Sequence, residues 1–305
     1  MTTLLCNGLL GFFMAALCHA APLQVAALHP LMADLARQVG GARVTVVDLV
    51  GEGGNPHRFE PRPGDLERMQ ASALVLAAGK GLEPYLNRLK DTLQGVSVVE
   101  VGSTIPSLMV AKDAAHPEHP ADADHPPDAA GTPDPHWWHG VENMRRAARV
   151  VALAMAAKDP AGKPIYLANA AAYGTRLGQL ERWARGELAK VPRAQRKLVT
   201  AHNAFAYFAR EFDFEVIAVA GLNDEQNNTP QQLAQTIEAV KQSGVKAIFP
   251  ELNANAKVLE SIATASATTL APPLIADGNG SGNNAGFEAM IRHNVAAITQ
   301  ALAAP

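Results

Sequence analysis

The chain has 305 residues, of which 48% are hydrophobic and 18% are charged, and its formal net charge is −3. This balance excludes a strongly basic surface, so we expect neither nucleic acid nor an anionic membrane as the main partner. Residues 1–21 contain no Asp, Glu, Lys or Arg, and an apolar run from Leu9 to Leu17 precedes a few small residues. The pattern predicts a secretory signal peptide over residues 1–21, and no later segment reaches the ~20 apolar residues of a transmembrane helix.

Both cysteines, Cys6 and Cys18, fall within the predicted signal peptide. The mature chain therefore has no disulfide, no thiolate ligand and no cysteine nucleophile, and any metal would be held by His, Asp or Glu. Leu17 is too bulky for the position before a lipidated cysteine, so we predict a periplasmic protein without a lipid anchor. The remaining length suits two domains of ordinary size.

Residues 22–140 are predicted to form an N-terminal α/β lobe. Four short apolar runs are typical of buried strands, namely Leu23–Leu28, Val44–Leu49, Leu74–Ala78 and Ser97–Val101. Helical segments such as Pro30–Val39 and Asp65–Ala71 separate them. Strands that alternate with helices indicate a parallel sheet covered on both faces.

A compositionally different segment, Lys112–Asp134, is rich in His, Pro, Ala and Asp. It lacks the apolar residues that would offset the entropy of ordering it, so we predict a mobile loop. Its histidines, His116, His119 and His125, allow two interpretations. They belong to a solvated linker without a specific role, or they capture metal weakly and raise its local concentration.

Residues 141–192 are predicted to be linking helices. A first helix covers Val141–Ala157, and a second begins between Pro160 and Pro164, because proline is tolerated only in a first turn. Apolar residues then recur at spacings of four and three along one helical face, namely Tyr166, Ala170, Tyr173, Leu177, Leu180 and Ala184. A helix from Pro164 to Ala189 would extend roughly 39 Å, enough to join two lobes as one rigid element.

Residues 193–305 repeat the arrangement as a C-terminal α/β lobe. The predicted strands are Lys197–Ala201, Phe214–Val219, Val245–Phe249 and Leu270–Ile275. Thr229 and Pro230 are a typical N-cap and first residue of a helix. The predicted fold class is therefore α/β, with two lobes that each contain a parallel sheet flanked by helices, joined by one long rigid helix.

Four side chains stand past the carboxyl ends of predicted strands, two in each lobe, and one of them comes after the His-rich segment that follows the fourth strand. They are His57, His136, His202 and Asp277. Open α/β sheets bind ligands beyond the carboxyl ends of their strands, so a ligand shared by all four would lie in the cleft between the lobes. Three imidazoles and one carboxylate suit four-coordinate zinc, whereas manganese and calcium prefer more oxygen ligands.

Two nearby carboxylates, Glu60 and Asp134, are candidates to accept the second ring N–H of a ligating histidine or to cap a helix start. Trp137 and Trp138 are expected to provide hydrophobic packing at the cleft wall.

Three other histidines are less favoured as ligands. His139 lies three residues after His136 and could substitute for it, but a supporting or surface position is favoured. His29 is expected to pack at the end of the first strand. His293 is expected on the surface of the last helix.

The chain resembles the zinc/manganese solute-binding proteins of ABC transporters (the ZnuA/TroA-like, or cluster A-I, group) over essentially the whole mature sequence. Three motifs carry the resemblance, namely Pro56-His57-x-Phe59-Glu60-Pro61, Asp134-Pro135-His136-Trp137 and Thr200-Ala201-His202-Asn203-Ala204-Phe205. Asp277 falls where that family places its fourth ligand. The chain departs from the family pattern at Trp138, at His139 and in the extended Leu222–Asn228 loop.

The resemblance implies a zinc-import protein. The family's third ligand is His in zinc importers and often Glu in manganese importers, so His202 favours the zinc branch. We expect a monomer that carries Zn²⁺ through the periplasm to an inner-membrane ABC permease and is not an enzyme. A periplasmic zinc metallochaperone is a further expected partner.

Three alternatives remain open. The chain could be a manganese-binding protein of the same fold. It could be a zinc hydrolase, although four ligands would fill the shell and the sequence has no H-E-x-x-H helix. An adhesin or storage role is a third class.

Overall fold

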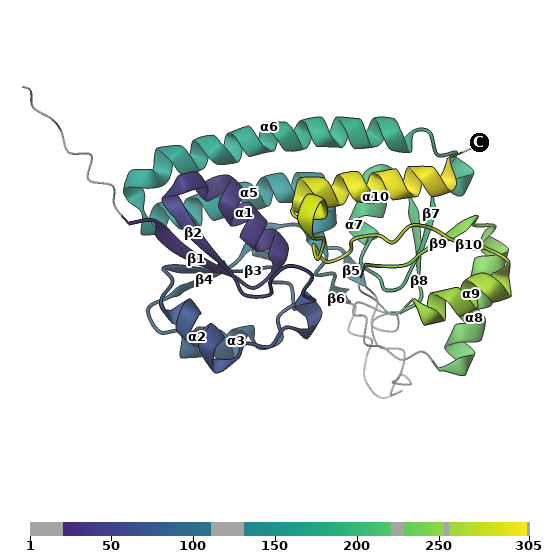
Figure 1. Cartoon of the computed structure of the whole chain (residues 1–305), viewed down its shortest axis with the longest axis horizontal. Coiled ribbons are helices and arrows are strands. Elements are labelled where there is room, and N and C mark those ends of the chain that lie inside the picture. The colour runs from purple at the N-terminus through teal and green to yellow at the C-terminus, as the bar shows by residue number, and fades with distance from the viewer. Residues whose placement is uncertain (1–20, 111–130, 221–228, 253–255, 304–305) are drawn as a thin grey trace, which may run out of the picture.

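The computed structural model describes residues 21–110, 131–220, 229–252 and 256–303. Two α/β lobes lie side by side beneath one long helix (Figure 1), which confirms the predicted fold class. Residues 1–20 of the predicted signal peptide, the histidines of the His-rich segment and the Leu222–Asn228 loop lie outside the described residues. No helix in the described ranges combines the length and apolar character needed to cross a membrane.

Lobe one contains a four-stranded parallel sheet in the order β2-β1-β3-β4. The strands are β1 (Leu23–Ala27), β2 (Val44–Asp48), β3 (Leu74–Ala77) and β4 (Ser97–Glu100). Helix α1 (Pro30–Gly40) covers one face, and α2 (Pro63–Gln70) and α3 (Leu86–Thr92) lie on the other (Figure 1). Alternate residues of β1 enter two separate apolar clusters, as expected for a strand buried on both faces.

Lobe two repeats this topology with a parallel sheet in the order β10-β9-β7-β8. Its strands are β7 (Lys197–Thr200), β8 (Glu215–Ala218), β9 (Ala247–Phe249) and β10 (Thr269–Leu270). Its helices are α7 (Ala206–Phe212), α8 (Pro230–Ser243), α9 (Lys257–Ser266) and α10 (Phe287–Leu302). Thr229 caps α8 in a capping box with Gln232, which confirms the predicted helix start.

The last predicted strand, Leu270–Ile275, is wrong in length, because β10 ends at Leu270. Pro272 and Pro273 have no N–H to donate to a neighbouring strand, so the ladder stops there, apart from one isolated bridge between Glu251 and Leu274. Asn294 of α10 replaces the lost partners: its side chain accepts from the N–H of Ile275 and donates to its carbonyl, both at 2.8 Å.

The predicted mobile loop also extends too far. Thr132–Pro133 forms strand β6, which pairs antiparallel with β5 (Met109–Val110). Asp134 is fully buried, and its N–H donates to the Leu108 carbonyl at 2.8 Å. The ordered structure therefore resumes before the second histidine motif.

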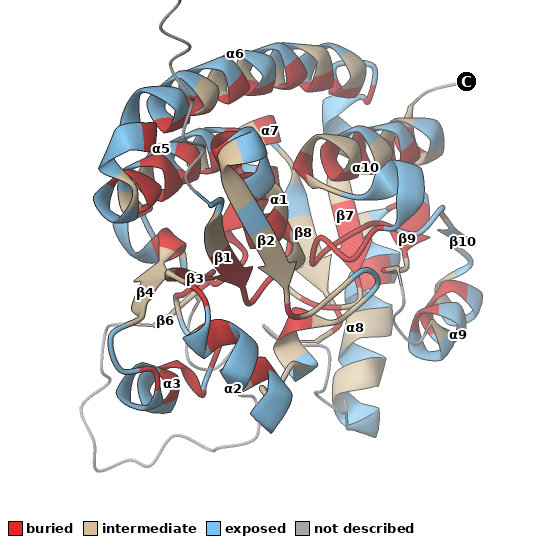
Figure 2. Ribbon diagram, turned by 60° about the vertical axis from the view of Figure 1, so that its left-hand side comes forward, coloured by how far each residue is buried: buried red, intermediate tan, exposed pale blue. Residues whose placement is uncertain are grey.

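The linking region consists of α5 (Val141–Lys158) and α6 (Lys163–Leu188). The predicted apolar face of α6 is buried, while its outer face is exposed (Figure 2). This helix packs against α1 of lobe one and α10 of lobe two. Its 26 residues correspond to about 39 Å, so one continuous element spans both lobes.

Short 3₁₀ turns complete the fold. They are η1 (Gly41–Arg43), η2 (Pro56–Arg58), η3 (Val101–Thr104), η4 (Trp137–His139), η5 (Pro160–Gly162), η6 (Arg193–Gln195) and η7 (Gly282–Asn284).

Candidate metal centre

His57 lies on η2, which follows the loop after β2. Asn55 starts this turn, because its side-chain Oδ1 accepts the backbone N–H of His57 at 2.9 Å, and Pro56 occupies the first helical position. Proline needs no hydrogen-bond partner there and fixes the backbone. The His57 side chain is 7% exposed, so its ring points into the protein.

His136 is held by the carboxylate of Asp134, two residues earlier. One oxygen, Oδ1, lies 2.9 Å from the backbone nitrogen and 2.8 Å from ring Nδ1 of His136. Both side chains are fully buried. Because Nδ1 donates to the carboxylate, Nε2 remains available as a metal ligand. Asp134 thus takes the supporting position predicted for it.

His202 is held in the same way by Glu251, which the sequence reading missed. The backbone N–H of His202 donates to Glu251 Oε1 at 3.0 Å, and its ring Nδ1 lies 2.5 Å from Oε2. Glu251 stands just past β9, as His202 stands just past β7, and these two strands are paired. The sequence offers one signal for this role: Glu251 follows the end of a predicted strand, and neighbouring parallel strands end at the same edge of a sheet.

Asp277 follows the segment that Asn294 holds in place. Its side chain is 7% exposed. Trp138 anchors the preceding residue from lobe one, because its indole N–H donates to the Ala276 carbonyl at 2.9 Å. Trp137 similarly donates to the Ala78 carbonyl at 3.0 Å, and both rings are fully buried, as expected for packing residues.

The structure brings the four predicted residues together, two from each lobe. Their ligand atoms all lie within 4.8 Å of one another. His57 Nε2 is 3.2 Å from His136 Nε2 and 3.3 Å from Asp277 Oδ1. In a tetrahedral zinc site with bonds near ~2.0–2.1 Å, neighbouring ligand atoms are about 3.3 Å apart. Two of these separations therefore already match such a site, while His202 Nε2 is farther from Asp277 Oδ1, at 4.0 Å.

The electrostatics of the site favour the protonation states that a cation needs. Burial lowers the pKa of His136, although the hydrogen bond and charge of Asp134 act in the opposite direction. Burial alone would raise the pKa of Asp277, but the hydrogen bond and charge of His57, together with the other two histidines of the site, outweigh burial and hold that pKa well below its usual range. The charges of His202 and His136 add to this effect. A neutral imidazole and an ionised carboxylate are the forms that coordinate metal.

Two further histidines lie close to the site, and both are fully buried. His29 packs on Trp138 with ring centroids 4.3 Å apart, as predicted, and its Nδ1 accepts the N–H of Leu31 to cap α1. His139 is not on the surface, because its ring packs 4.5 Å from that of Phe205. Burial lowers the pKa of each to about 3.

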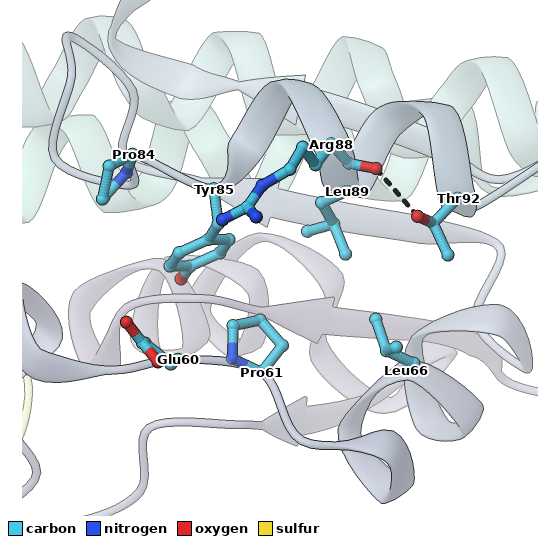
Figure 3. Close-up of a pocket in the computed structure, with 8 residues that line it drawn as sticks. All are labelled: Glu60, Pro61, Leu66, Pro84, Tyr85, Arg88, Leu89 and Thr92. Carbon is cyan, nitrogen blue, oxygen red and sulfur yellow. Dashed lines mark hydrogen bonds between the residues drawn. The ribbon is translucent and has the colours of Figure 1, made fainter.

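Glu60 does not support a ligand. Its side chain is exposed and lines a pocket between α2 and α3, together with Pro61, Tyr85 and Arg88 (Figure 3). His293 is partly exposed, and its Nε2 lies 2.8 Å from the Pro273 carbonyl.

Comparison with known proteins adds a family match. The model described as "ZnuA: Zinc-uptake complex component A periplasmic" matches residues 25–301. The solved structure of the periplasmic zinc binding protein TroA from Treponema pallidum superposes with a TM-score of 0.80 at 25% identity. It covers 93% of this chain and 100% of TroA.

Two curated relatives are both named manganese-binding lipoprotein MntA. The one from Halalkalibacterium halodurans is 29% identical over 276 residues, which is 90% of this chain and 86% of the relative. The one from Bacillus subtilis is 30% identical over 287 residues, which is 92% of this chain and 90% of the relative. These names do not support the prediction that the chain lacks a lipid anchor, and Cys18 lies outside the described residues.

Proposed function

Because the chain belongs to the ZnuA family of extracytoplasmic metal-binding components of ABC transporters, we propose that its cargo is Zn²⁺. The proposed ligands are His57, His136, His202 and Asp277. The observation that carries this proposal is their convergence: one ligand atom from each, within 4.8 Å of the other three. We also propose that the site lies between two lobes, residues 22–140 and 193–305, and that the helices of residues 141–192 connect them rigidly.

Zinc is favoured by the chemistry of the donors. Three nitrogens and one carboxylate oxygen form a four-coordinate set that suits a metal without a demand for six ligands. The two carboxylates that hold His136 and His202 orient the rings and increase their basicity, which strengthens binding of a cation that prefers imidazole nitrogen.

Manganese is the second candidate. The two MntA relatives are named for it, and their sequences align with almost the whole of this chain. A manganese site would favour additional oxygen ligands. The proposal of zinc therefore rests on the donor set of this chain, against the names of those relatives.

The family consists of transport components, so the chain is not an enzyme. As the binding component of a metal ABC transporter, it works with a membrane permease and an ATPase. We further propose that the permease lies in the inner membrane, that the chain reaches it as a periplasmic monomer, and that a metallochaperone can load the site.

The test is direct competition. The metal-free chain is incubated with equimolar Zn²⁺ and Mn²⁺, desalted and measured by elemental analysis. We expect one zinc per chain and little manganese. A variant with His57→Ala, His136→Ala and His202→Ala should retain neither ion, whereas the matched control His293→Ala should behave as wild type. Predominant manganese would establish the second candidate, and stoichiometric metal in the triple variant would refute the site.

A further inference from the structure

One of the hydrogen bonds that join the lobes lies outside the buried site. The carboxylate of Glu52 accepts the backbone N–H of Gly282 at 2.6 Å, across 230 residues of sequence. Both residues are exposed. Glu52 lies in the loop between β2 and η2, which carries His57, and Gly282 opens η7, five residues after Asp277. The contact therefore ties together the two segments that supply one proposed ligand from each lobe.

The loop is shaped to present Glu52. Gly51 and Gly53 on either side of it have φ values of 78° and 73°, a region that favours glycine. Asp48 Oδ1 accepts the N–H of Gly51 at 3.0 Å, and the N–H of Gly54 donates to the Gly51 carbonyl at 3.3 Å. These bonds turn the backbone so that the side chain between the two glycines projects outward.

On the other lobe, the backbone N–H of Gly282 would otherwise have no acceptor within its own turn. The first N–H groups of a helical turn have no partner within that turn. Ser281, which precedes η7, makes no side-chain cap, so the Glu52 carboxylate takes the place of the cap.

We infer that Glu52 is a positioning residue that slows metal release by holding the His57 loop against the Asp277 segment. The inference rests on the proposed function. His57 is the ligand that this contact can affect most. Among the described residues, no carboxylate holds its Nδ1, whereas Asp134 and Glu251 hold the other two rings. Because the contact is exposed to water, its loss should increase the release rate only about 3- to 10-fold.

The test measures zinc release from the loaded full chain by stopped flow against excess chelator. We expect Glu52→Ala to release zinc about 3- to 10-fold faster than wild type, with unchanged stoichiometry. Glu52→Gln keeps an oxygen that can accept the Gly282 N–H, so it should remain within about 2-fold of wild type. Glu67→Ala on α2 removes the same charge from an exposed site in lobe one and should have no effect.

Each outcome has a distinct meaning. Release from Glu52→Ala at the wild-type rate would overturn this inference and leave the proposed function standing. If Glu52→Ala and Glu52→Gln both slowed zinc association without changing release, Glu52 would act by attracting the cation, and the inference would be wrong. A wild-type chain that retained no zinc would overturn the proposed function and, with it, this inference.

Discussion

The two lobes hold their most deeply buried proposed ligands with the same chemistry but through different routes along the chain. In lobe one, Asp134 lies two residues before His136, so one short segment supplies both the ring and its carboxylate. In lobe two, Glu251 lies 49 residues after His202 and reaches it only because β7 and β9 pair. The same arrangement is thus local in one lobe and depends on tertiary structure in the other.

His57 provides the contrast within lobe one. Asn55 holds its backbone N–H, but among the described residues no carboxylate fixes its Nδ1. Two of the three rings are therefore oriented before any metal binds, and the third has more freedom. We therefore expect His57 to be the proposed ligand that moves first during release.

The largest effects on zinc affinity should come from removal of either histidine ring that a carboxylate holds. We expect His136→Ala and His202→Ala each to weaken zinc affinity at least about 100-fold, because a ligand is lost and a buried carboxylate loses its partner. Isothermal titration with a competing chelator measures both. If only one of the two weakened binding, the two lobes would not contribute equally.

Smaller effects on zinc affinity are expected from changes to the two carboxylates that hold these rings. Asp134→Asn and Glu251→Gln should each weaken affinity about 10- to 100-fold, since the ring remains but is less well oriented and less basic. Glu60→Gln is the matched control and should change affinity less than about 2-fold, because Glu60 faces the pocket between α2 and α3. A much larger loss of affinity for Asp134→Asn than for Glu251→Gln would show that the carboxylate close in sequence supports its ring more strongly than the distant one.

The smallest effect concerns a residue at the junction of the lobes. His139 has a pKa lowered to about 3, whereas an unfolded histidine titrates near ~6.5. The unfolded state therefore binds more protons below pH 6.5, and the metal-free fold loses stability as pH falls. His139→Phe should reduce that loss by about 1 kcal/mol between pH 6.5 and 5.5.

Urea unfolding of the metal-free wild type and variant at the two pH values measures this difference. Because Phe can also pack on Phe205, the variant should fold. An identical loss of stability in both proteins would show that His139 is protonated in the native state.

Much of the fold followed from local patterns. The strands of lobe one, the buried face of α6 and the Thr229 cap each depend on residues close in sequence, so their periodicity and capping signals sufficed. The predicted end of β10 is wrong because Pro272 and Pro273 lie within an apolar run, although neither can donate a hydrogen bond to a neighbouring strand.

In the candidate site, too, some residues could be predicted from the sequence and others depend on tertiary structure. His57, His136, His202 and Asp277 could be predicted together because they follow the strands of two parallel sheets, and ligands bind beyond the carboxyl ends of such strands. Glu251 could not, because its role depends on which strand pairs with β7. The burial of His139 depends equally on packing between distant elements, in this case the ring of Phe205.

The continuous helix α6 has a consequence for transport as a whole. It packs against α1 of lobe one and α10 of lobe two. A wide swing of either lobe would therefore pull that lobe's helix away from α6 and expose the apolar faces of both helices. Loaded and empty forms should therefore have nearly the same outline, and the permease must distinguish them by the local surface around the ion rather than by the shape of its carrier.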